Sequence, residues 1–177
     1  MYKRQSRDFT VLIVMDADER RVVYHKFWDS QSWAQVQQHI AAISEEWGLQ
    51  RIVADATGMG RAMVEDLMTY NMPVEGVSLQ KNVREQMLAS LTVAMEHKTI
   101  TFPAIPILLR QLRAFQHIRM SNGNFKAQAP AGEHDDEVFA LGLALSACNE
   151  PQGSRTRGRG FGKRYMPTQA EANSGYG

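Results

Sequence analysis

The sequence contains a single cysteine, Cys148, and this scarcity excludes two classes of protein. One cysteine cannot form an internal disulfide framework or a zinc site with several cysteine ligands. The chain also lacks any apolar run approaching the roughly 18 residues that a transmembrane helix needs, and no apolar stretch near Met1 resembles a secretion signal. We therefore predict a cytosolic protein with a reduced thiol.

A nucleotide-binding loop is missing as well. No segment matches Gly-x-x-x-x-Gly-Lys-Ser/Thr, the pattern whose backbone amides hold ATP phosphates, so ATP hydrolysis is not encoded here. With 177 residues, the chain has room for one domain.

The net charge of +1 is unevenly distributed along the chain. Residues 151–177 contain five basic residues against one acid, together with six of the thirteen glycines and almost no aliphatic side chains. Such a segment cannot bury enough apolar surface to offset the entropy of ordering it. We predict that residues 150–177 form a disordered basic tail, which either contacts phosphates loosely or only improves solubility.

Apolar periodicity predicts one α/β domain over residues 8–149. Strands are expected over 9–16, 21–29, 51–55 and 74–79, with a second hairpin over 118–127 around an Asn-Gly turn. Helices are expected over 33–47, 57–70, 82–98 and 135–148, and another should begin at Pro106. An antiparallel pair followed by alternating strands and helices predicts a three-layer domain with a mixed sheet.

Asp55 is the first candidate for chemistry, because it ends an apolar strand and begins a glycine-containing turn. Ligands usually bind at the C-terminal ends of such strands, so its carboxylate should project into a crevice. A structural role is the alternative: Asp55 bonds only the backbone amides of the turn, or Thr57 caps the following helix.

A second acidic site, Glu-His-Asp-Asp-Glu at 133–137, lies where the last helix begins. The helix dipole favours acids at that position, so simple capping is the alternative to a functional role. Adjacent helical positions diverge by about 100°, so Asp135 and Asp136 cannot both point squarely at one metal ion. The apolar helix that follows must be buried and therefore holds its acidic start close to the sheet. Carboxylates on a strand end and a helix start favour a site for Mg²⁺ or Mn²⁺.

The histidines carry weaker signals. His25 lies in a predicted strand and His39 in a predicted helix, and we expect both on the surface. No Ser-His-Asp arrangement for nucleophilic catalysis is found.

Four segments in this order resemble the C-terminal nuclease domain of the large terminase subunit of tailed bacteriophages: RDFTVLIVMD, RIVADATGMG, GVSLQK and GEHDDEVFALGLAL. The resemblance runs from about Arg7 to Ala147 and is most specific in the Asp-x-Thr-Gly-x-Gly turn and the His-Asp-Asp helix start. It implies a ribonuclease H-like fold and a metal-dependent endonuclease that cleaves concatemeric viral DNA during packaging.

The resemblance also implies roles for individual residues. Asp55 and Asp136 would be the second and third acidic ligands of two Mg²⁺ or Mn²⁺ ions, and Asp135 would be an auxiliary catalytic acid. His134 would lie near the active centre and Asp8 at its periphery.

The resemblance further implies partners: double-stranded DNA, a terminase ATPase domain, the small terminase subunit and the portal, in the host cytoplasm at the procapsid. Basic side chains are candidates for phosphate contacts without base-specific readout. These candidates are Lys81, Arg84, Arg110 and Arg113.

One element of the family pattern is absent. The family begins with a strand that supplies the first metal-binding aspartate, but here residues 1–7 contain no acid, and five of the seven are charged or polar. We expect residues 1–7 to be a non-native or disordered leader, and the chain to lack its first, central strand. Loss of a central strand exposes unpaired edges on its neighbours and puts cleavage by this chain alone in doubt.

Two alternatives remain open at this stage. Another ribonuclease H-like nuclease, such as a junction resolvase or a transposase, would share the fold. A non-catalytic DNA-binding or docking module is favoured by the absent first aspartate and the basic tail.

Overall fold

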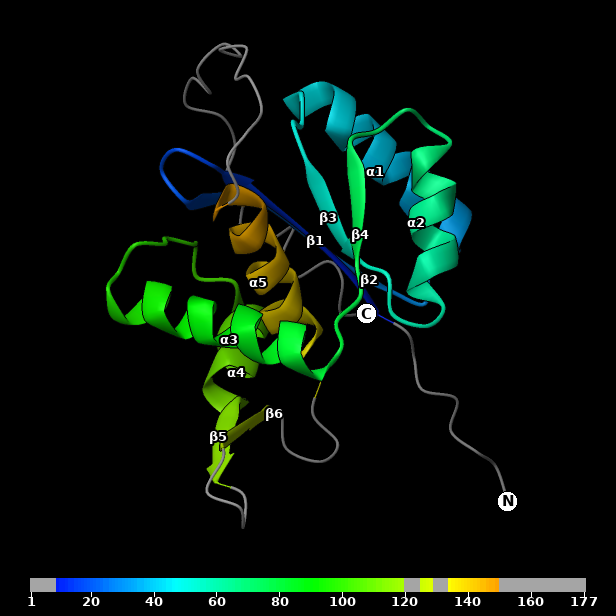
Figure 1. Ribbon diagram of the computed structural model, residues 1–177. Helices are drawn as coiled ribbons and strands as arrows, with labels where there is room; N and C mark the ends of the chain where they lie inside the picture. The colour runs from blue at the N-terminus through cyan, green and yellow to red at the C-terminus, as the bar shows by residue number, and fades with distance from the viewer. Residues whose placement is uncertain (1–8, 120–124, 129–133, 150–177) are drawn as a thin grey trace.

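The computed structural model describes residues 9–119, 125–128 and 134–149. Asp8, the predicted leader and tail, and the predicted Asn-Gly turn lie outside the described residues. The chain runs through β1 (Phe9–Asp16), β2 (Arg21–Asp29), α1 (Trp33–Trp47), β3 (Ile52–Asp55), α2 (Gly60–Met68), β4 (Val74–Val77), α3 (Lys81–Glu96), α4 (Pro106–Ala114), β5 (Gln116–Arg119), β6 (Phe125–Gln128) and α5 (Asp136–Asn149) (Figure 1). Every predicted helix and strand is present, with ends shifted by a few residues.

The predicted first hairpin is confirmed. β1 and β2 pair antiparallel from Phe9 opposite Asp29 to Asp16 opposite Arg21, with a bulge after Val14. The turn between them is closed by the Asp16 carboxylate, whose Oδ1 accepts the backbone N–H groups of Asp18 and Glu19, both at 2.9 Å. Short acidic side chains commonly stabilise turns in this way.

Local signals at both ends determine the extent of α1. Ser32 is the N-cap, and it forms a capping box with Gln35. Gly48 ends the helix with a φ of 59°, a conformation that glycine adopts without steric cost. The buried face of α1 packs with Trp28, Ile52 and Leu67, and this contact forms one of the two apolar cores.

The second apolar core lies on the other side of the strands. It joins Val22 of β2 to buried residues of α3, α4 and α5, among which Leu108 and Leu141 are 0% exposed. Figure 1 shows α1 and α2 on one side of the strands and α3, α4 and α5 on the other. The predicted three-layer arrangement is therefore present.

The predicted mixed sheet is divided. Its strands form separate two-stranded sheets: β1 with β2 antiparallel, β3 with β4 parallel, and β5 with β6 antiparallel. In residues 9–119, 125–128 and 134–149, no strand lies between β1 and β3 to join the β1–β2 pair to the β3–β4 pair.

None of the helices in the described part of the chain is long and apolar enough to cross a lipid bilayer.

Candidate functional site: an acidic groove between β1 and β3

A groove of about 690 Å³ separates β1 from β3. Side chains of α5 line one side of it, and side chains of α1 and α2 line the other. Asp55, Arg84, Asp135 and Asp136 all line this groove. The two acidic sites that the sequence singled out therefore line the same groove, although they lie far apart along the chain.

Asp55 is the last residue of β3, and its side chain is exposed. Its Oδ1 accepts the backbone N–H of Thr57 at 2.8 Å, which is the turn contact that the structural alternative expected. Thr57 does not cap α2 through its side chain; its hydroxyl instead accepts the N–H of Leu79 at 2.9 Å. No partner of Oδ2 of Asp55 is found among the described residues, so one carboxylate oxygen is available to a ligand.

The backbone of the turn after Asp55 requires glycine at two positions. Gly58 has a φ of 58°, a region that residues with a side chain rarely adopt. A Cβ atom at Gly60 would lie 2.2 Å from the backbone oxygen of Asp55. The spacing of the Asp-x-Thr-Gly-x-Gly turn is therefore a steric requirement of this strand-to-helix connection.

Asp135 lies just before α5 and is paired with a cation from α3. Its Oδ2 accepts a hydrogen bond from Nη2 of Arg84 at 2.9 Å, and the guanidinium of Arg84 stacks 4.1 Å from the centre of the Phe139 ring. Both side chains are partly exposed, at 39% for Arg84 and 29% for Asp135. The carboxylate of Asp135 is thus already paired with Arg84.

Asp136, the first residue of α5, lies in a different environment from Asp135. Burial raises the pKa of its carboxyl group, the neighbouring Asp135 adds to this effect, and nearby His134 opposes it. Nδ1 of His134 lies 3.7 Å from Oδ2 of Asp136, and the His134 ring packs edge-on against Phe9 with centroids 4.4 Å apart. Asp136 is therefore a partly desolvated carboxylate at the end of the groove where β1 begins.

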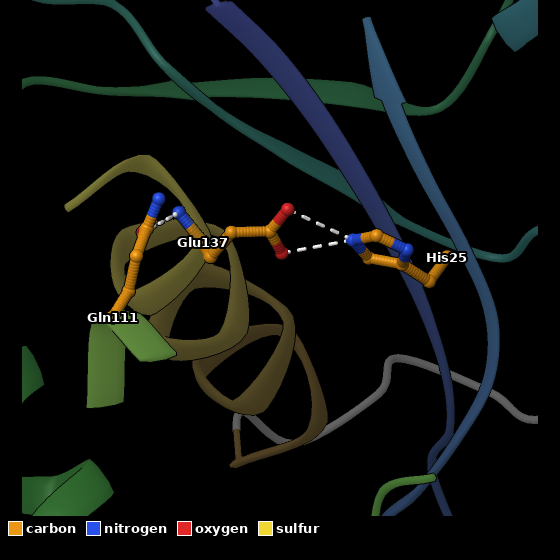
Figure 2. A network of polar contacts seen from close by, with 3 residues as sticks. All are labelled: His25, Gln111 and Glu137. Atoms are coloured by element: carbon orange, nitrogen blue, oxygen red, sulfur yellow. Dashed lines mark hydrogen bonds and ion pairs between the residues drawn. The ribbon is translucent and has the colours of Figure 1, made fainter. Parts of the chain in front are cut away.

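Glu137 faces away from the groove and is fully buried, at 0% exposure. Figure 2 shows its carboxylate pointing at His25 of β2: the two oxygens lie 2.8 Å and 3.0 Å from Nε2 of His25. The Glu137 backbone N–H, one of the amides left free at a helix start, donates to Oε1 of Gln111 at 2.9 Å. These contacts attach the first turn of α5 to β2 and α4, and thereby orient Asp136.

The expectation that His25 lies on the surface is wrong, because its side chain is only 9% exposed. The sequence of the last helix did contain a signal that Glu137 is buried. Glu137 lies four residues before Leu141 and eight before Leu145, both nearly fully buried, so it belongs to the same face of the helix.

The other predicted site residues are not gathered at the groove. Lys81 is exposed at the first position of α3, one turn before Arg84. Arg110 and Arg113 are exposed on α4, and no residue of α4 lines the groove. Among the four basic candidates, Arg84 alone lines it.

The donor chemistry of the groove suits a hard divalent cation in part. Asp55 and Asp136 offer carboxylate oxygens, and the desolvated Asp136 would gain from a nearby cation. Within the described ranges, however, no three histidine, cysteine, aspartate or glutamate side chains are grouped so that they could hold a metal ion. Complete coordination therefore requires additional oxygen ligands, from water, a phosphate or another carboxylate.

Replacing Arg84 by alanine should lower the free energy of unfolding by about 1 kcal/mol, since it removes a partly exposed ion pair and a cation–π contact. Arg84→Lys should recover only part of this loss, because lysine cannot reproduce the planar stacking on Phe139. Urea denaturation followed by circular dichroism measures both changes. Arg110→Ala, at an exposed helical position, is the control; equal losses for Arg84→Ala and Arg110→Ala would contradict the prediction.

Comparison with known proteins identifies relatives that match most of the chain. A family model described as the terminase RNaseH-like domain matches residues 3–147. The large terminase subunit of Thermus virus P23-45 is 31% identical over 147 residues, which cover 80% of this chain. The chain covers only 30% of the length of that relative.

Solved structures give the same result for the fold. The large terminase nuclease of thermophilic phage G20c, with bound magnesium, has a TM-score of 0.72 and 28% identity, over 82% of this chain and 77% of that chain. The large terminase nuclease domain of Thermus phage P74-26 has a TM-score of 0.73 and 26% identity, over 88% of this chain and 80% of that chain. The G20c nuclease is also known with bound cobalt and with bound zinc. These similarities confirm the predicted ribonuclease H-like fold and the resemblance to terminase nuclease domains.

Proposed function

Because this chain belongs to the terminase RNaseH-like domain family, we propose that it is the metal-dependent DNA endonuclease domain of a phage large terminase subunit. Its proposed role is to cleave concatemeric viral DNA during genome packaging, in the host cytoplasm at the procapsid portal. The observation that carries the proposal is that Asp55 and Asp136 line one groove. The magnesium bound to the similar G20c nuclease supports a metal-dependent reaction.

Asp55 and Asp136 are the proposed ligands of two Mg²⁺ or Mn²⁺ ions. The chemistry that such a pair supplies is stabilisation of the attacking and leaving oxygens in phosphodiester hydrolysis. Asp55 contributes the carboxylate oxygen that the turn leaves unused, and Asp136 contributes a desolvated carboxylate that the Glu137–His25 contact orients. Asp135 and His134 act as auxiliary residues: Asp135 holds Arg84 beside the groove, and His134 supports Asp136.

Positive charge beside the groove is proposed to position the DNA backbone. Arg84 lies at the groove, and Lys81 lies one helical turn away on α3, so both can contact phosphates near the acidic residues. Arg110 and Arg113 on α4 would contact a more distant part of the duplex. The ATPase domain, the small terminase subunit and the portal are the proposed partners in packaging.

Mutation of either proposed ligand should abolish metal-dependent cleavage. The assay is nicking of supercoiled plasmid by the protein in Mn²⁺. Asp55→Asn and Asp136→Asn should each lower the nicking rate by at least about 100-fold, since even the loss of residues that merely support metal ligands costs 10–100-fold.

Glu65→Gln is the control, because Glu65 is an exposed acid on α2 and does not line the groove. It should leave the nicking rate unchanged. Asp55→Asn and Asp136→Asn variants that cleave as fast as the Glu65→Gln variant would overturn the assignment of the ligands.

A non-catalytic DNA-binding or docking module is the second candidate. It is favoured by one observation: in the described part of the chain, no three histidine, cysteine, aspartate or glutamate side chains are grouped so that they could hold a metal ion. Calorimetric titration with Mn²⁺ separates the two functions, because a docking module should bind no Mn²⁺ at millimolar concentration. The junction-resolvase and transposase alternatives lose support, since the matching family and the relatives compared above are terminases.

A further inference from the structure

The rim of the groove carries a large apolar side chain that the protein does not bury. Met59 lies in the turn after Asp55, lines the groove and is 75% exposed. The other exposed large apolar side chains in the described part of the chain are between 38% and 52% exposed, and none of them lines the groove. Single exposed apolar residues are common on protein surfaces, so the surroundings of Met59 decide whether its exposure has a function.

The turn that carries Met59 has a fixed backbone. The N–H of Gly60 donates to the carbonyl oxygen of Thr57 at 3.0 Å, and the N–H of Thr57 donates to Oδ1 of Asp55 at 2.8 Å. A Cβ atom at Gly60 would lie 2.2 Å from the backbone oxygen of Asp55, so the turn packs closely against the end of β3. Met59 is therefore presented from a fixed backbone position beside Asp55, while its unbranched side chain stays adaptable.

Cations flank Met59 on two elements. Arg61 is exposed in the first turn of α2, two residues after Met59. On the other side, the N–H of Leu79 donates to the Thr57 hydroxyl at 2.9 Å, which joins the turn to the connection between β4 and α3 (Figure 1). Lys81 is exposed at the start of α3, two residues later. Among the described residues, neither Arg61 nor Lys81 forms an ion pair, so both are available to phosphates.

An exposed apolar side chain between two such cations suits a nucleic-acid duplex better than an apolar protein surface. The phosphates on the outside of a duplex pair with lysine and arginine. Apolar side chains such as methionine insert between base pairs, unstack them and kink the duplex. A protein partner would instead require a larger contiguous apolar patch. The neighbours of Met59 in the turn are Gly58 and Gly60, which add no apolar side chain.

We propose that Met59 inserts into a base-pair step of the DNA duplex that binds at the groove, while Arg61 and Lys81 contact phosphates. This inference rests on the proposed function, because it takes double-stranded DNA as the ligand. Insertion requires unstacking, which costs least at pyrimidine–purine steps such as T-A. Met59 is thereby a specificity-determining residue: it directs the protein to steps that open easily, without reading any base through hydrogen bonds.

The first measurement follows unstacking in the absence of metal, so it does not depend on cleavage. The probe is a short duplex in which 2-aminopurine replaces the adenine of a single central T-A step, because its fluorescence rises when the base unstacks. At low salt, which strengthens phosphate contacts, saturating parent protein should raise the fluorescence at least about twofold. Met59→Ala should bind without this rise. Met59→Leu keeps a flexible apolar side chain of similar volume and should retain most of it.

The second measurement compares affinities for matched and mismatched duplexes by fluorescence anisotropy. A mismatch at the central step lowers the cost of unstacking, so the parent should bind the mismatched duplex at least about fivefold more tightly than the matched one. Met59→Ala should bind both duplexes equally. Met68→Ala is the matched control, because Met68 is another exposed methionine on α2 and does not line the groove. It should behave like the parent in both measurements.

Four results would overturn the inference. Equal fluorescence rises for the parent and Met59→Ala would show that Met59 does not open the step. An equal loss in Met68→Ala would show that the effect is not specific to the groove. A parent that nicks plasmid in Mn²⁺ but leaves the T-A step stacked would overturn this inference and leave the proposed function intact. A parent that neither binds the duplex nor nicks plasmid would overturn both.

Discussion

Glu137→Ala is expected to lower the free energy of unfolding by about 1–3 kcal/mol through the hydrogen bond alone, which is typical of leaving a buried polar group without its partner. The variant removes the carboxylate that contacts His25 and leaves Nε2 of that ring without a partner among the residues that the structure describes. It also opens a cavity between α5 and β2. Urea denaturation followed by circular dichroism measures the loss.

The matched control is Glu85→Ala, at an exposed glutamate on α3, which should change stability by no more than about 0.5 kcal/mol. Glu137→Gln keeps the volume and a polar contact to His25, so its loss should be smaller. If Glu137→Ala proves too unstable to study, the Glu137→Gln variant and a double-mutant cycle with His25→Ala still measure the coupling. A loss no larger than that of Glu85→Ala would show that the pair does not anchor α5.

Asp136→Asn is expected to have opposite effects with and without metal. Burial raises the pKa of Asp136 in the folded state, so ionising this carboxyl at neutral pH opposes folding. The neutral amide removes that cost, and the metal-free variant should melt at a higher temperature than the parent at pH 7. The difference should disappear as the pH falls below the ordinary range of an aspartate pKa, because both side chains are then uncharged.

Metal should reverse the order of the melting temperatures of the parent and the Asp136→Asn variant. If Asp136 is a ligand, Mn²⁺ at 100 times its dissociation constant should stabilise the parent by about 2.7 kcal/mol, and the Asp136→Asn variant much less. The stabilisation should weaken as the pH falls through the raised pKa of Asp136, because a ligand must lose its proton to bind. Thermal melts with and without Mn²⁺ test this, with Glu65→Gln as the control. An unchanged Mn²⁺ effect in Asp136→Asn would remove Asp136 from the metal site.

Elements defined by short-range signals could be predicted from the sequence. The apolar spacing of α1, the Ser32 cap and the terminal Gly48 lie within a few residues of the backbone groups that they satisfy. The position of Asp55 at the end of β3 was also predictable, because an apolar strand followed by a glycine turn places its last side chain at a sheet edge. The pairing of strands was harder, since it joins segments that are distant in the sequence.

The roles of the consecutive acids at the start of α5 depended on long-range contacts. The sequence showed that Asp135 and Asp136 diverge around the helix but not which of them faces the groove freely. The structure pairs Asp135 with Arg84, leaves Asp136 partly desolvated, and buries Glu137 against His25. His25 was assigned to the surface, although it lies between Val23 and Phe27 on an apolar strand face.

By itself, the sequence determined the order of helices and strands, the resemblance to a family and the two acidic segments that are candidates for a site. Only the tertiary structure decided that the sheet is divided between β1 and β3, which carboxylate each cation or histidine engages, and that the division is a groove with an apolar interior. The physical reason is the distance along the chain between the interacting groups. The backbone groups of helix caps and turns find hydrogen-bond partners within a few residues. A sheet edge or a buried polar side chain finds its partners only in segments that folding brings from elsewhere in the chain.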